Sequence, residues 1–269
     1  MPSARLPPRS GLWYYEPVTL TIFSLGVAGL SMLAGLVGAL TGLGGGVLLV
    51  PLLTLGFGVN VRYAAGASLV SVIATSSGAA STYIRDGLTN IRLGILLEVA
   101  TTIGAVGGAI LAARLSTGTI ALIFGIVLLY SALSTTRPRL DVAEEGYTVH
   151  RVPLGFGVMA IAGVVSGLLG IGSGALKVLA MDRVMRLPFK VSTTTSNFMI
   201  GVTAAASAGI YLRRGYINPV IVWPVMLGVL VGALLGARVL RAAPVLWLRR
   251  LFTVVVVVLA VEMIIKGIR

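Results

Sequence analysis

Two glycine-rich stretches, Thr41-Gly-Leu-Gly-Gly-Gly46 and Leu169-Gly-Ile-Gly-Ser-Gly174, stand about half the chain apart in this sequence of 269 residues. The interval from Gly46 to Gly174, called the repeat interval below, also separates matching residues on both sides of the glycines, which indicates two copies of one unit. Each copy interrupts an apolar stretch with residues that adopt unusual backbone dihedrals. The sequence therefore predicts two related halves, each with a broken helix. The other matched positions are Ala34/Ala162, Gly35/Gly163, Val37/Val165, Arg62/Lys190, Ser68/Ser196, Thr75/Thr203, Tyr83/Tyr211, Arg85/Arg213, Gly87/Gly215 and Asn90/Asn218.

The composition is typical of a membrane protein. Hydrophobic residues make up 57% of the chain and charged residues 11%, and the mean hydropathy is +1.02. A soluble domain carries about 25% charged residues, so this chain cannot cover a water-facing surface. Six uncharged runs are each long enough to cross a bilayer core as a helix of about 20 residues. We expect an all-α polytopic membrane protein that contacts the lipid bilayer. The runs are 17–61, 63–84, 115–136, 152–176, 191–212 and 215–237.

The charged and reactive residues exclude several other classes of function. The net charge is +13, but the basic residues cluster at the ends of apolar runs, where they snorkel to lipid headgroups. This placement argues against nucleic acid as a partner. The chain has no cysteine and a single histidine, and no pair of carboxylates lies in an apolar stretch. We therefore expect no enzyme, no metal and no cofactor.

The polar segments divide the chain into four parts. Residues 1–16 form a basic and aromatic lead-in, 17–136 the first transmembrane repeat, 137–151 a polar linker and 152–269 the second repeat. Each half holds a long apolar run, the glycine break, a short second arm and three further helices. If each short arm crosses the membrane, there are ten crossings and the second half is inverted; we favour inverted halves, and the number of crossings stays open between eight and ten. If the arms do not cross, there are eight crossings and the halves run parallel.

The fourth helix of each half is rich in glycine and alanine. The segments 104–115 and 228–239 match at an interval four positions shorter than the repeat interval, which predicts that four residues were lost from the second half before Gly228. Small residues every four positions let helix backbones approach closely in lipid. Such faces pack either within one chain or between two copies, so a homodimer is among the expected partners.

The glycine breaks are the best candidates for a binding site. Broken backbone inside a membrane is tolerated only where protein buries it or where it lines a watery cavity. The helix that begins after each break directs free N–H groups and a positive dipole end at that cavity, which suits an anion. Paired breaks in two halves also mark transporter substrate sites. The alternative is that the glycines only permit tight helix crossing. The candidates are Gly44, Gly45, Gly46, Gly172, Ser173 and Gly174.

Polar side chains near the breaks complete the predicted site. Lys177 lies three residues after Gly174 in an apolar arm, and it needs either an anionic substrate or a path to headgroups, since a lysine at mid-membrane costs about 2.5–3.5 kcal/mol. Glu98 is interpreted either as a proton carrier or, preferably, as a carboxylate that pairs with an arginine such as Arg92 or snorkels to the interface. The hydroxyl and amide candidates are Ser68, Thr75, Ser196, Asn197 and Thr203.

The chain resembles the sulfite exporter TauE/SafE family. The resemblance rests on Gly42-Leu-Gly-Gly-Gly46 followed by Val50-Pro51, on Gly170-Ile-Gly-Ser-Gly174, and on the Tyr-x-x-x-Gly-x-x-Asn pattern that ends at Asn90 and at Asn218. It covers roughly residues 20–268. The resemblance implies a bacterial inner-membrane protein of about eight helices that exports sulfite, sulfonates or related small anions. Ser173 and Lys177 depart from the first half, so a strictly symmetric site is not expected.

Together these features predict a secondary transporter for a small sulfur-containing oxyanion. Alternating access would proceed by rocking one half against the other. A passive anion channel, or a transporter of another small anion, is the alternative that the sequence leaves open.

Overall fold

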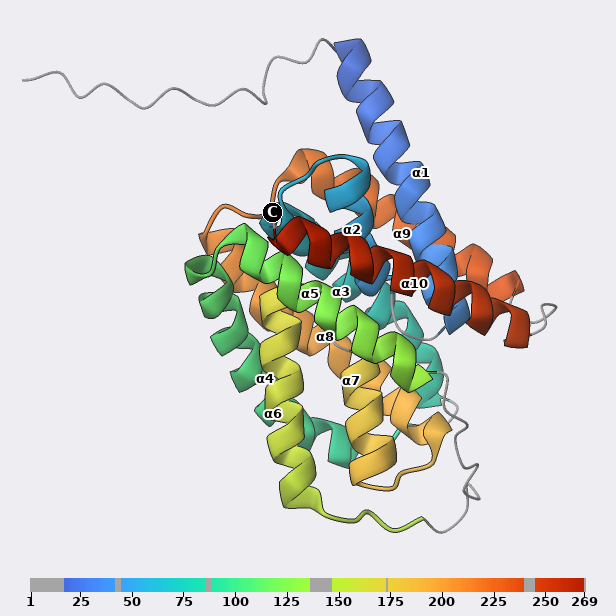
Figure 1. Ribbon diagram of the computed structural model, residues 1–269. Coiled ribbons are helices and arrows are strands. Elements are labelled where there is room, and N and C mark those ends of the chain that lie inside the picture. The colour runs from blue at the N-terminus through green and yellow to red at the C-terminus, as the bar shows by residue number, and fades with distance from the viewer. Residues whose placement is uncertain are drawn as a thin grey trace, which may run out of the picture.

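The computed structural model describes residues 17–41, 45–85, 89–135, 147–172, 174–239 and 245–268, and these residues form helices without any strand. Within them, two helices meet both the length and the hydropathy needed for a membrane span, Ile91–Arg114 and Val152–Leu169. Figure 1 shows the arrangement. The elements are α1 (Pro17–Thr41), α2 (Gly46–Gly56), α3 (Val61–Arg85), α4 (Ile91–Arg114), α5 (Thr117–Thr135), α6 (Val152–Leu169), α7 (Gly174–Leu179), the π-helical turn η1 (Ala180–Val184), α8 (Phe189–Arg213), α9 (Pro219–Val239) and α10 (Val245–Ile268).

The helices recur with the spacing of the glycine motifs. The ends of α1 and α6 are separated by the repeat interval, and so are the ends of α3 and α8. The short arms also match, because α7 continues into η1 and the two together have the length of α2. Local structure therefore follows the sequence period closely. The pairs of helices whose first residues are separated by the repeat interval are α2 and α7, α3 and α8, α4 and α9, and α5 and α10.

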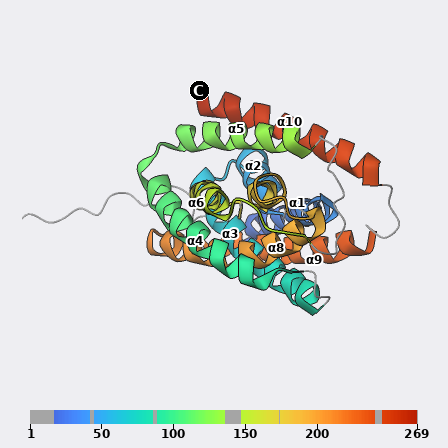
Figure 2. The ribbon, with the colours of Figure 1, turned by 90° about the horizontal axis from the view of Figure 1, so that it is seen from below.

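The short arms are half-length elements. α2 has 11 residues, and at 1.5 Å per residue it extends about 16 Å, roughly half of a 30 Å hydrocarbon core. Figure 1 shows α6 rising from the lower end of the molecule and α7 returning downward, whereas α1 descends from the upper end. Seen from below, α6 and α7 are both viewed end-on (Figure 2). The arm therefore reverses the direction of the chain although it is too short to cross a membrane by itself.

Helices of one half pack on helices of the other. α1 packs on α9 and α4 on α6, while α5 lies against α10 and α3 against α8. Figure 2 shows α5 and α10 side by side along one face of the molecule. The first and fourth helices of the two halves are thus exchanged, and the halves are interlocked.

Glycines on α4 and α9 make these exchanged contacts possible. A Cβ atom on Gly104 would overlap the carbonyl oxygen of Ala160 on α6, and one on Gly232 would overlap that of Met32 on α1. The two glycines are separated by the repeat interval, and so are their two contact residues. The predicted shorter interval for these helices is therefore wrong, because it aligned similar letters one helical turn out of register. No residues are missing from the start of α9.

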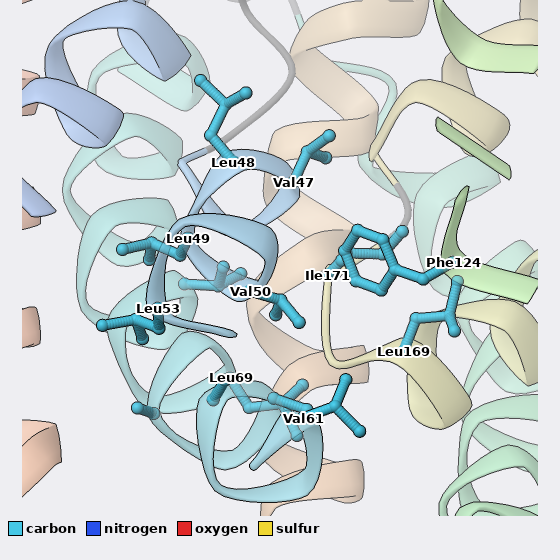
Figure 3. Packing of buried hydrophobic residues seen from close by; sticks show 14 of the residues in the cluster. Val47, Leu48, Leu49, Val50, Leu53, Val61, Leu69, Phe124, Leu169 and Ile171 are labelled. Atoms are coloured by element: carbon cyan, nitrogen blue, oxygen red, sulfur yellow. The ribbon is translucent and has the colours of Figure 1, made fainter. Parts of the chain in front are cut away.

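α2 lies in the middle of the apolar core. It is apolar on every side, as expected for a helix surrounded by protein, and Leu49, Val50 and Leu53 are almost fully buried. Figure 3 shows these side chains facing α3 on one side and Phe124 of α5 and Ile171 of the second break on the other. The arm that the first glycine break creates is thus held by residues from both halves.

The Tyr-x-x-x-Gly-x-x-Asn pattern builds the turn between α8 and α9. Gly215 has φ +72° and ends α8, and the Tyr216 N–H donates to the carbonyl of Tyr211 across it. The Asn218 side chain then accepts from the N–H of Val220 at the start of α9. The Tyr211 hydroxyl donates to the carbonyl of Leu168, just before the second glycine break. This motif fixes the scaffold around the break.

Candidate functional site

The two glycine breaks lie next to each other inside the protein. A Cβ atom on Gly46 would come within 3.2 Å of the carbonyl oxygen of Ile171, and within 2.8 Å of Val72 on α3. One on Gly172 would come within 3.1 Å of the same valine. Gly172 has φ +70°, which residues with a side chain rarely adopt. The absence of side chains thus lets both broken segments approach α3.

Two matched serines hold the first residue of each short arm. Ser68 Oγ donates to the carbonyl of Gly46 over 3.4 Å, and Ser196 Oγ donates to the carbonyl of Gly174 over 3.2 Å. Both serines are fully buried. Their hydroxyl hydrogens are therefore used by the protein backbone at the two breaks, in equivalent ways.

Lys177 is the centre of a buried polar group. Its side chain is 0% exposed, so it does not reach the headgroups. Lys177 Nζ donates to Thr203 Oγ1 on α8 and forms an ion pair with Glu98 Oε2 on α4 at 3.7 Å. Thr203 Oγ1 in turn donates to Glu98 Oε1 over 2.6 Å. Three helices thus supply one member each to a buried charge pair bridged by a hydroxyl.

Two further threonines surround the carboxylate of Glu98. Thr101 Oγ1 donates to Oε2 and Thr102 Oγ1 donates to Oε1, both over 3.0 Å. Glu98 therefore pairs with Lys177, and the preferred prediction of an arginine partner is wrong. Arg92 lies almost two turns earlier on an exposed part of α4. The error arose because the partner is distant in sequence and is brought to α4 only by the packing of α7 and α8.

The remaining predicted site residues are distributed as follows. Gly44 and Ser173 lie outside the described residues. Gly45 precedes α2, where its backbone faces Val229 of α9. Asn197 lies half-buried on α8. Thr75 bonds to carbonyls of its own helix, at Ser71 and Val72, and so differs from its counterpart Thr203.

Sequence reasoning did not consider Thr101 and Thr102, and it weighed Glu98 as a proton carrier without placing it among the substrate-binding residues. A signal was present in the spacing, since residues three and four positions after Glu98 share its helix face. Hydroxyls at both positions indicate a carboxylate that the fold keeps in place. The link from this cluster to Lys177 had no signal in a single sequence.

In the part of the chain that the structure describes, these features define an all-helical protein with an internal charged group next to two glycine breaks, as expected of an integral membrane protein. The family model for the sulfite exporter TauE/SafE family matches residues 27–263, and the chain belongs to this family.

Curated relatives are similar over nearly their whole length. A probable membrane transporter protein of Bacillus subtilis, YunE, is 27% identical over 89% of this chain and 96% of its own. A second from the same organism, YdhB, is 27% identical over 84% of this chain and 91% of its own. A probable membrane transporter protein of Xylella fastidiosa strain Temecula1 is 30% identical over 93% of this chain and 95% of its own. No solved structure matches this chain. The protein is therefore a membrane transporter of this family.

Proposed function

We propose that this chain is a secondary transporter that exports a small sulfur-containing oxyanion, either sulfite or an organosulfonate. The observation that carries the proposal is the complete burial of Lys177 three residues after the second glycine break. A buried ammonium is costly in a membrane and is retained where it binds a charged partner. The family name supplies the substrate class. No catalytic step is part of the proposal.

We further infer that the two halves are inverted repeats. The inference is supported by helix boundaries that recur at the repeat interval and by the opposite directions of α1 and α6. The packing also agrees with a twofold axis that relates the two halves. Such an axis exchanges α1 with α6 and α9 with α4, so the contact of α1 with α9 becomes the contact of α6 with α4. Each half has five elements, and each of them reverses the direction of the chain, although the short arm does not cross the membrane fully. Because five is an odd number, the second half is inverted even though the chain makes fewer than ten full crossings.

The interlocked halves change which parts would move during transport. Rocking whole sequence halves apart would separate α4 from α6 and α1 from α9, where glycines bring the backbones together. We therefore propose that the moving bodies are the exchanged units, one with α1 and α9 and the other with α4 and α6. Lys177 and Thr203 would belong with the second unit, because α8 packs on α4.

The experiment that tests this function is sulfite flux into liposomes that contain the purified protein, with sulfate and taurine as competitors. A carrier gives flux that saturates with sulfite concentration and falls when a competing anion is added. Flux that rises without saturation would identify the passive channel instead. The absence of sulfite flux, in a protein that remains folded after reconstitution, would overturn the proposal.

A further inference from the structure

The hydroxyls around Glu98 have two sets of acceptors. Thr203 Oγ1 lies 2.6 Å from Glu98 Oε1 and also 3.0 Å from the carbonyl of Met199 in its own helix. Thr101 Oγ1 lies 3.0 Å from Glu98 Oε2 and 3.1 Å from the main-chain carbonyl of Glu98. A hydroxyl carries one hydrogen and can both donate and accept. Each threonine can therefore turn its hydrogen from the carboxylate to a backbone carbonyl.

This arrangement accommodates two protonation states of Glu98. When the carboxylate is ionised, the hydroxyls donate to it. When it is protonated, a hydroxyl that has turned to its backbone acceptor can accept the new carboxyl hydrogen. No buried donor is then left without an acceptor, which would otherwise be strongly unfavourable. The site is therefore suited to taking up and releasing a proton at Glu98.

The charge balance then links this proton to an anion. Lys177 is fully buried, and Glu98 is the acidic residue paired with it among the described residues. Protonation of Glu98 leaves the ammonium without a counter-charge, and a buried charge without its partner is strongly destabilising. An anion that entered while Glu98 was ionised would instead give the site a net negative charge. A monovalent anion and a proton that bind together keep the site neutral.

Few other charged residues occur on the elements packed around the pair. α6, which packs on α4, contains no charged residue, and on α8 Lys190 and Arg213 occupy the two ends. At 1.5 Å per residue these positions are about 20 and 15 Å along the helix from Thr203. Beyond α7, η1 carries the half-buried Asp182 and the exposed Arg183, and on α4 Arg92 is exposed. Among the described residues, Lys177 is thus the charged side chain that contacts Glu98.

We propose that Glu98 carries the coupling proton of this transporter, one proton bound at its carboxylate for each anion bound at Lys177, with Thr203 changing its hydrogen-bond acceptor between the two states. In this step the Glu98 carboxylate gains a proton, and the Lys177 ammonium replaces its ion pair with Glu98 by one with the anion. The covalent bonds of the anion do not change. The proposal rests on the anion-transport function given above. In this proposal, the Lys177–Glu98 ion pair seen in the structure is the state of the site before the anion binds.

The test compares the wild type with Glu98→Gln in proteoliposomes, since glutamine has the size of the protonated acid and cannot ionise. Sulfite gradients are imposed at mildly acidic pH, where sulfite is mostly the monovalent hydrogensulfite ion, while potassium and valinomycin set the voltage. The dependence of the net sulfite flux on this voltage gives the charge moved per sulfite, which is zero when one proton accompanies each monovalent anion. We expect Glu98→Gln to move one more negative charge per sulfite than the wild type. Glu262→Gln, which removes an exposed carboxylate on α10, is the matched control and should behave as the wild type.

Each result decides between the alternatives. An equal charge per sulfite in the wild type and Glu98→Gln overturns the coupling role while leaving transport in place. Absence of sulfite flux in the wild type is a different result, and it overturns the proposed function itself. If Glu98→Gln binds without transporting, calorimetry in two buffers of different ionisation enthalpy should show one proton fewer taken up on sulfite binding than in the wild type, and equal uptake overturns the proposal. A Glu98→Gln protein that does not fold even with sulfite present also overturns it, because this variant reproduces the protonated state.

Discussion

Helix boundaries and helix contacts recur in the two halves of the sequence, but the residues at the centre of the candidate site differ. Around the second arm, Lys177, Thr203 and Glu98 form the buried charge pair and its bridge. The positions one repeat interval away hold Leu49, Thr75 and Met226. α2 packs on α3 as α7 packs on α8, and α3 packs on α9 as α8 packs on α4. Equivalent helices therefore surround a charge pair at the second arm and uncharged residues at the first arm.

This difference separates scaffold from function. Features present in both halves, such as the serines that hold the breaks and the glycines between exchanged helices, fix the backbone. The charge pair occurs only around the second arm, since Leu49 and Met226 stand at the positions equivalent to Lys177 and Glu98. A buried charge is expensive, so its restriction to one arm agrees better with the single coupling centre proposed above than with two equivalent sites.

The largest effect is expected from Lys177→Met. It leaves the Glu98 carboxylate buried without its counter-charge, which costs about 3–5 kcal/mol of folding stability, and sulfite flux should be lost. Leu49→Met is the matched control in the first half and should keep both. Thermal unfolding in detergent and proteoliposome flux measure the two quantities. The double variant Lys177→Met/Glu98→Gln should regain stability without flux, and recovery of flux would contradict a role for Lys177 in anion binding.

A slightly smaller effect, equal in both halves, is expected from the glycine contacts. A Cβ atom at Gly104 would overlap the carbonyl oxygen of Ala160, and one at Gly232, its equivalent one repeat interval away, that of Met32. Alanine at either position should lower the free energy of unfolding by about 1–3 kcal/mol, as overpacking does. Gly107→Ala, on the same helix as Gly104 but without any atom within 4 Å of its Cβ, is the control and should unfold no earlier than the wild type. Unequal effects at Gly104 and Gly232 would argue against a shared scaffold.

Thr203→Val and Thr75→Val, at equivalent positions of the two halves, should differ in their effect on sulfite flux. Hydrogen bonds to charged groups contribute about 1.5–3 kcal/mol each, so sulfite flux should fall about 10- to 100-fold if one such bond is needed in transport. Thr75→Val removes only hydrogen bonds to carbonyls of its own helix and should change flux less than about twofold. The initial rate of sulfite uptake, corrected for protein incorporated, measures both. Similar losses in the two variants would show that the first half also contributes a functional hydroxyl.

The smallest effect is expected at the matched serines. Ser68→Ala and Ser196→Ala each remove one neutral hydrogen bond to a break carbonyl, which contributes about 0.5–1.5 kcal/mol. Thermal unfolding should show a similar, small decrease for both. A loss of flux in Ser196→Ala alone, at unchanged stability, would instead assign this serine to the substrate.

Much of the scaffold could be predicted from the sequence because its signals are local or periodic. The glycine breaks, the short arms and the helices of each half follow from runs of apolar residues and from the repeat. Lys177 and Thr203 also stand out in the sequence, as a lysine in an apolar arm and a matched hydroxyl, and the structure places the two in contact. The register of α9 was wrong because glycine and alanine recur every four residues there, and such a pattern matches itself after one helical turn.

The sequence by itself determined that this chain is a helical membrane protein of two similar halves with a glycine break in each, because apolar composition and a long repeat are properties of the chain alone. Only the tertiary structure decided that α1 packs on α9 and α4 on α6, and that Glu98 is the partner of Lys177. The physical reason is that a buried charge selects its counter-charge by distance in space. That distance is set by three helices whose packing depends on side-chain shape across both halves.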